Sequence, residues 1–170
     1  MLAIALAVGA DVLALPVSRA VGAFAVATSA TASLSITITG LDLTPTYTVP
    51  LTVTDTRTTP TAGWNVTITS TQLTTTAPVH LLSTTASRVT GVAVGTCTGG
   101  TCVAPVNSIA FPVTVPAGST PPTAVKFYNA KAATGEGVYP VTPTIQVSVP
   151  GNAYAGSYSS TLTISLVSGP

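Results

Sequence analysis

The ionisable side chains that could support catalysis are few and far apart along the chain. His80 is the single histidine and lies in the apolar run Pro78–Leu82. A Ser–His–acid triad would have to take its acid from Asp42, Asp55 or Glu136, and no nucleophile-elbow pattern accompanies any of them. The wide sequence spacing of the acids does not indicate a glycosidase-type carboxylate pair either. We interpret His80 as a structural residue and expect no catalytic residues and no enzyme.

Metal and cofactor ligands are equally sparse. A calcium site needs several clustered oxygen ligands, and the chain has four acidic residues in no such cluster. A zinc site needs about four ligands, and only His80 could join the two cysteines. We therefore predict no metal site and no cofactor.

The two cysteines, Cys97 and Cys102, lie at the ends of a tight Gly-Gly turn. In an exported protein this spacing indicates a disulfide, to which the chain-entropy model assigns about 2 kcal/mol of stabilisation. A redox centre and a zinc site are the alternatives. Redox pairs usually have two intervening residues, whereas four separate these cysteines, so we favour the structural disulfide.

Amphipathic aromatic residues offer another kind of chemistry, because exposed rings in secreted β-domains can stack on sugars. The chain has six large ones: Tyr47, Trp64, Tyr128, Tyr139, Tyr154 and Tyr158. We predict Trp64, Tyr154 and Tyr158 as binding residues. The alternative for Trp64 is a core position, which is favoured because Trp64 is in phase with Val66 and Ile68.

Alternation of apolar and polar residues predicts the elements that must position these side chains. The clearest strand is 157–166, where Leu162, Ile164 and Leu166 share one face and serines and threonines the other. Similar patterns predict strands at 31–39, 47–54, 64–70, 88–95, 106–115, 125–127 and 144–149, and 129–143 is predicted to be a loop. Pro50 and Pro112 lack an amide donor, so their strands should lie at sheet edges or carry bulges.

Many short strands without a long amphipathic helix predict an all-β protein. Parallel sheets need crossover connections that are usually helical, and none is visible. We expect an antiparallel β-sandwich of the immunoglobulin-like type formed by one domain, residues 28–170.

The N-terminal residues 1–27 form a separate, signal-like apolar segment. Asp11 and Pro16 interrupt its apolar runs, which argues against a membrane-spanning helix. Small residues at Ala23, Ala25 and Ala27 provide cleavage sites for a secretory signal peptide. A retained apolar segment packed on the domain is the alternative.

Low charge is the main compositional constraint on function. Only 5% of the residues are charged, and the net charge is +1. Without a basic run to neutralise phosphates, nucleic acid is not an expected partner. So few charges also give little electrostatic protection against self-association, which suits a protein held in a wall, matrix or assembly.

Two segments together resemble the WxL surface domain family. Gly63-Trp64-Asn65-Val66-Thr67-Ile68 resembles its first signature, and Ala155–Pro170 resembles its C-terminal signature. The departures from these patterns are Val66, where the family has Leu, and Ile164, where it usually has Trp. The alternation places Ile164 on one face with Leu162, which indicates a core position.

The resemblance implies a secreted, non-catalytic module at the surface of a Gram-positive-type bacterium. Its expected partner is the peptidoglycan of the cell wall, bound non-covalently, and its family often works with a membrane-anchored surface protein. The alternative function is a structural subunit of an extracellular fibre or surface layer that self-associates through β-strand edges.

Overall fold

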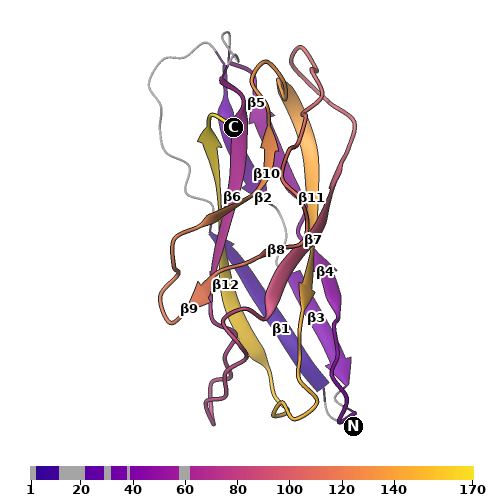
Figure 1. The fold of residues 1–170 in the computed structure, drawn as a ribbon, viewed down its shortest axis with the longest axis vertical. Helices are drawn as coiled ribbons and strands as arrows, with labels where there is room; N and C mark the ends of the chain where they lie inside the picture. Colours follow the sequence, from indigo (N-terminus) through magenta and orange to yellow (C-terminus); the bar gives the residue numbers. More distant parts are fainter. Residues whose placement is uncertain (1–2, 12–21, 29–31, 38, 58–61) are drawn as a thin grey trace.

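The protein is built from two β-sheets packed against each other (Figure 1). The computed structural model describes residues 3–11, 22–28, 32–37, 39–57 and 62–170. Within these ranges no helix has the length and apolar character needed to cross a membrane. The two packed sheets confirm the predicted all-β sandwich.

Sheet A has the strand order β10-β6-β12-β1-β3, with β9 beside β6. Its strands are β1 (Ala3–Asp11), β3 (Ala32–Thr37), β6 (Trp64–Thr71), β9 (Ala117–Gly118), β10 (Val125–Ala130) and β12 (Tyr158–Ser168). Sheet B has the order β2-β5-β11-β7-β8, with β4 beside β11. Its strands are β2 (Phe24–Thr28), β4 (Thr46–Thr48), β5 (Leu51–Asp55), β7 (Ser87–Val94), β8 (Val113–Thr114) and β11 (Gly137–Val147).

Strand β12 has the buried face that its alternation predicts. Tyr158, Leu162 and Ile164 are buried, whereas Ser159 and Thr161 are exposed. Successive side chains on a strand point to opposite faces, so one row enters the core while the other faces outward. The core position predicted for Ile164 is confirmed, and Ile164 lies opposite Ile68 of β6.

Strand β6 is buried more completely than its sequence pattern predicts. Beyond the expected core row, the polar residues Asn65 and Thr69 are also buried. The Thr69 hydroxyl donates to the Pro122 carbonyl oxygen at 2.8 Å, and the Asn65 side-chain amide donates to the Gly169 carbonyl oxygen at 2.6 Å. These hydrogen bonds offset the cost of burying the Thr69 hydroxyl and the Asn65 side-chain N–H, while Asn65 Oδ1 is buried with no partner among the described residues.

The prolines divide the strands of sheet B differently from the prediction. The predicted strand 47–54 is interrupted at Pro50 into β4 and β5, and β5 lies between β2 and β11 rather than at an edge. The predicted loop 129–143 instead contains most of β11. Pro143 is tolerated there because it falls between the residues of β11 that pair with β5 and those that pair with β4.

The predicted strand 106–115 was mostly wrong, because only Val113–Thr114 forms a strand. The preceding backbone is bonded by side chains instead: the Ser108 amide donates to Asn129 Oδ1 at 2.8 Å, and Asn107 Nδ2 donates to the Ile109 carbonyl oxygen at 2.9 Å. Hydrogen bonds from side chains to the backbone compete with the backbone hydrogen bonds of a sheet. Pro112 does precede an edge strand, since β8 ends sheet B.

The predicted N-terminal segment 1–27 contributes two strands. Strand β1 pairs in parallel with β12 and antiparallel with β3, and β2 pairs antiparallel with β5. The β1–β12 and β6–β9 pairs are the parallel exceptions in the described part of an otherwise antiparallel sandwich. Residues 1–2 and 12–21 of the segment lie outside the described residues, and its cleavage stays a prediction.

The side chain of Trp64 is fully buried, and its indole N–H donates to the Gly135 carbonyl oxygen at 2.9 Å. Its ring also packs against Tyr128, with 5.9 Å between the ring centroids. Gly135 has a φ of +77°, and a side chain there would lie 2.5 Å from Trp64 Nε1. The indole and the glycine therefore fit each other closely.

Truncating Trp64 should lower the free energy of unfolding more than truncating the exposed Tyr154 does. Trp64→Ala should lower the free energy of unfolding by about 3–5 kcal/mol, because it leaves a large cavity. Tyr154→Ala removes a mainly exposed ring and should cost roughly 0.5 kcal/mol or less. Urea unfolding followed by circular dichroism measures both. Equal losses in the two variants would contradict the core role of Trp64.

Candidate binding site at one end of the sandwich

Three loops meet at the lower end of the molecule in Figure 1, and we call them together the loop end: residues 39–43, 73–82 and 150–157. The first and third are joined by reciprocal backbone hydrogen bonds of 2.8 Å between Leu43 and Val149. The Gly151 amide also donates to Asp42 Oδ1 at 2.8 Å. These bonds fix the two loops beside each other.

The second loop is a hairpin closed by its own polar groups. The Leu82 amide donates to the Leu73 carbonyl oxygen at 3.0 Å. At the tip, the buried Thr75 hydroxyl donates to the Pro78 carbonyl oxygen at 2.5 Å and accepts the His80 amide at 2.7 Å. This arrangement fixes the backbone of His80 near the tip of the hairpin, and its predicted structural role stays a prediction.

His80 and Tyr154 join the hairpin to the third loop. Their rings are stacked, with 3.7 Å between the centroids and an interplanar angle of 7°. The Tyr158 hydroxyl donates to the Tyr154 carbonyl oxygen at 3.0 Å. Burial raises the pKa of the Tyr158 phenol, so this donor stays protonated at neutral pH. Exposed Tyr154 is therefore contacted at its ring by half-buried His80 and at its backbone by buried Tyr158.

The surface of the loop end is apolar and almost uncharged. Four of its large apolar or aromatic side chains are more than half exposed: Leu41 (70%), Val79 (66%), Leu81 (58%) and Tyr154 (64%). Asp42 is the one acidic residue in the three loops, which contain no Lys or Arg and a single histidine, His80. The Gly151 amide donates to the Asp42 carboxylate. Exposed apolar groups gathered in one place mark an interaction surface more often than scattered ones do.

The three predicted binding residues have different environments. Trp64 and Tyr158 are 0% and 2% exposed, so neither offers a ring face to a ligand in this structure. Tyr158 instead supports Tyr154, which is exposed. A ligand role for Trp64, Tyr154 or Tyr158 stays a prediction, and the geometry favours Tyr154 among them.

Sequence analysis missed the other exposed apolar residues of the loop end. Leu41, Val79 and Leu81 lie outside the alternating strands. The one feature of the sequence that could have indicated their exposure is that they lie in turns containing Pro or Gly. That signal is weak, because single exposed apolar residues are common. Only the tertiary structure brings these turns together.

Asp55, one of the acids considered as a partner for His80, is paired with an arginine instead. Asp55 is fully buried and paired with Arg57, whose Nε and Nη2 lie 2.7 and 2.8 Å from its two carboxylate oxygens. This hydrogen-bonded pair raises the pKa of Arg57. The guanidinium also lies 3.9 Å from the centroid of the Phe24 ring and donates to Ser168 Oγ at 2.7 Å. Its contacts therefore connect β2 with the end of β12.

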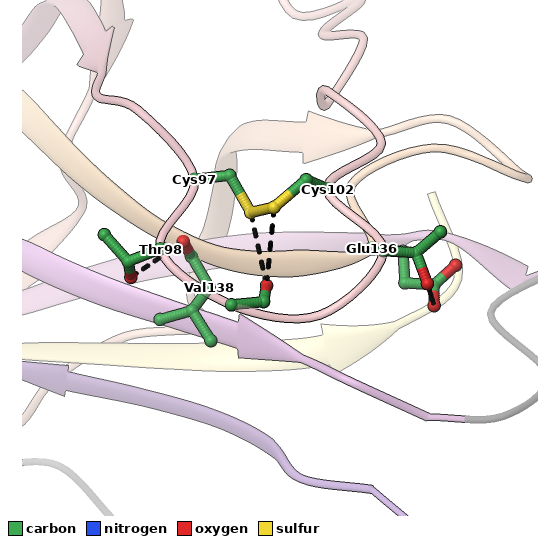
Figure 2. Close-up of a disulfide and its surroundings, with 7 residues drawn as sticks. Cys97, Thr98, Cys102, Glu136 and Val138 are labelled. Carbon is green, nitrogen blue, oxygen red and sulfur yellow. Dashed lines mark hydrogen bonds between the residues drawn. A yellow bond between two sulfur atoms is a disulfide. The ribbon is translucent and has the colours of Figure 1, made fainter.

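The disulfide predicted between Cys97 and Cys102 is present (Figure 2). Figure 2 shows its loop against strand β11, with the Thr98 hydroxyl 3.5 Å from the Val138 carbonyl oxygen. The Thr98 amide donates to the same oxygen at 2.9 Å. The Thr101 hydroxyl donates to Glu136. Gly137 lies against the bridge, since a Cβ there would be 2.7 Å from Cys97 Sγ. The disulfide stabilises the end of the sandwich opposite the loop end.

The fold and the apolar loop end define a β-sandwich module with a surface suited to binding. A family model described as the WxL domain, surface cell wall-binding, matches residues 24–170. The chain therefore belongs to this family of binding domains. A search of curated proteins returned no match.

The two segments that carry the family resemblance are neighbouring strands. Strand β6 contains the first and β12 the second, and their register places Val66 opposite Leu166 and Trp64 opposite Ser168. The two departures from the family pattern, Val66 and Ile164, are both buried. These substitutions therefore exchange one apolar core residue for another and leave the outer surface unchanged.

Removing the disulfide should destabilise the domain without altering the loop end. The double variant Cys97→Ser/Cys102→Ser should lose about 2 kcal/mol of unfolding free energy, because its unfolded chain regains the entropy of a six-residue loop. Chemical unfolding of this variant beside the oxidised wild type measures the difference. A Thr98→Ser variant controls for a change in the same loop. Equal stability of the double variant and wild type would contradict the predicted role.

Proposed function

We propose that this protein is a secreted module that binds the peptidoglycan of a Gram-positive-type cell wall non-covalently through the loop end. Membership of a surface cell wall-binding family supports the wall as the partner. The observation that supports this particular surface is the group of exposed apolar side chains around the stacked Tyr154. The proposed activity is binding without catalysis.

The chemistry of the loop end suits a largely uncharged wall polymer. One face of the Tyr154 ring lies against His80, and Tyr154 as a residue remains 64% exposed. An exposed aromatic face can cover the apolar C–H face of a sugar, and the ring needs little reordering because Tyr158 holds its backbone. Leu41 and Val79 extend the apolar surface around it.

Export of the module is part of the proposal. A disulfide in a small β-domain fits an oxidising, extracellular location. The signal-like segment 1–27 supports the same location, and the family match begins at residue 24, where β2 also begins. A membrane-anchored surface protein is a further proposed partner.

The proposal predicts that wall binding depends on the loop end and not on the opposite end. The double variant Leu41→Ser/Tyr154→Ala should lower affinity for purified peptidoglycan at least about fivefold, as expected when anchoring side chains near the centre of an interface are truncated. Sedimentation of the protein with insoluble peptidoglycan over a range of wall concentrations measures this affinity.

The matched control is Val103→Ser/Val106→Ser, which changes two exposed apolar residues in the segment that follows the disulfide loop. All proteins should be shown to be folded by circular dichroism. If the folded wild type does not sediment with the wall, the proposed function is wrong. If the control loses as much affinity as the loop-end variant, the proposed surface is wrong.

Assembly through sheet edges is a second candidate function, and the position of β1 favours it. Residues 6–11 of β1 pair with 158–163 of β12, yet β1 precedes the residues that match the family. A chain without β1 would expose unpaired backbone groups on β12, which a strand from a second copy could cover. Sedimentation velocity across a hundredfold concentration range tests this function. Concentration-dependent oligomers would support it, and a constant monomer would contradict it.

A further inference from the structure

A second feature lies next to the loop end: a groove of about 630 Å³ between the hairpin, the end of β6 and the start of β12. This volume is within the range of small-ligand sites. Nine residues line it: Thr71, Gln72, Thr74, Leu81, Gly118, Ser119, Ser159, Ser160 and Thr161. Six of these carry hydroxyl groups, one carries an amide, and none carries a charge.

Internal hydrogen bonds fix the floor of the groove. The Ser160 hydroxyl donates to the Thr71 carbonyl oxygen at 2.6 Å, and the Thr161 amide donates to the Thr71 hydroxyl at 2.8 Å. The Gln72 side-chain amide donates to the Leu82 carbonyl oxygen at 2.7 Å, which holds the hairpin against β6. Much of the lining is therefore already ordered before a ligand binds, which lowers the entropy cost of binding.

Other polar groups of the groove remain available to a ligand. Ser119 and Thr161 are exposed, and their hydroxyls make no hydrogen bond to the described residues of the chain. Leu81 adds an exposed apolar side chain to the rim. A hydroxyl can both donate and accept, so this set matches a ligand that alternates hydroxyl or amide groups with apolar C–H surface.

We infer that this groove binds the neutral glycan backbone of the wall polymer, an inference that rests on the proposed function. A wall offers three chemically different ligands: glycan strands, charged stem peptides and anionic phosphate polymers. None of the described lining residues provides a cation for a carboxylate or phosphate or an anion for an ammonium group, so the two charged ligands would lose hydration without an ionic partner. A neutral N-acetylated sugar chain carries no charge whose hydration would be lost on binding.

The groove and Tyr154 can contact one continuous ligand. Thr74 and Leu81 of the groove belong to the same hairpin as His80, which stacks on Tyr154. Reciprocal backbone hydrogen bonds of 3.1 and 2.9 Å between Thr74 and Ser159 attach that hairpin to β12. A sugar chain lying in the groove is thus directed along the hairpin toward the exposed tyrosine.

The test uses the full chain and a defined probe, the β-1,4-linked tetramer of N-acetylglucosamine. Titration calorimetry measures its affinity, and competition measures how well it displaces the protein from insoluble peptidoglycan. Ser119→Trp should fill the groove from an exposed position and weaken tetramer binding about tenfold or more. Thr90→Trp places the same bulk on an exposed position of sheet B and should leave affinity unchanged. Circular dichroism and thermal unfolding confirm that both variants are folded.

The outcomes separate this inference from the proposed function. If the tetramer binds and Ser119→Trp alone weakens it, the glycan site is supported, whether or not intact wall is bound. If the wild type binds the wall but not the tetramer, or if a free stem peptide is the competitor that displaces it, the glycan site is wrong while wall binding stands. Tetramer binding that both tryptophan variants retain at wild-type affinity would overturn the location of the site.

Discussion

The ladder between β6 and β12 is the interaction on which the rest of the structure depends. It pairs residues 64–70 with 162–168 and thereby joins the two segments that identify the family. Ile68 and Ile164 face each other within it, and both are buried. Towards the loop end their pairing stops at Ser70 and Leu162, and the residues just beyond it, Thr71, Ser160 and Thr161, line the groove. The core and the proposed binding surface are therefore consecutive parts of one strand pair.

Low charge sets the second constraint, because this chain has few ion pairs with which to order its surface. Asp55 and Arg57 form the one salt bridge among the described residues, and it is largely buried. Serine and threonine hydroxyls take over much of the local ordering, as Thr75 does in the hairpin and Ser160 does in the groove. A surface ordered in this way is neutral and rich in hydroxyl groups, which is the chemistry that a sugar polymer can use.

Alternation along the chain was sufficient to predict the sandwich, the core row of β12 and the buried position of Ile164. It failed where backbone donors were missing or satisfied in other ways. Gly135 and Gly137 made residues 129–143 resemble a loop, although β11 begins at Gly137. Side-chain bonds from Asn107 and Asn129 kept a strand-like sequence out of the sheet. Of the exposed side chains at the candidate site, only Tyr154 was predicted from the sequence as a binding residue. The groove is formed by segments from residues 71–81, 118–119 and 159–161, and no local pattern indicates that they meet.

Amide chemical-shift mapping of the isotope-labelled full chain, titrated with soluble disaccharide-containing peptidoglycan fragments, tests most directly where the wall is bound. Binding through the loop end and its groove predicts perturbed signals in residues 39–43, 73–82, 118–119 and 150–161. Signals from the disulfide loop and residues 131–137 should stay unchanged. Perturbations confined to the disulfide end, or none at fragment concentrations that saturate competition with intact wall, would contradict this assignment of the binding surface.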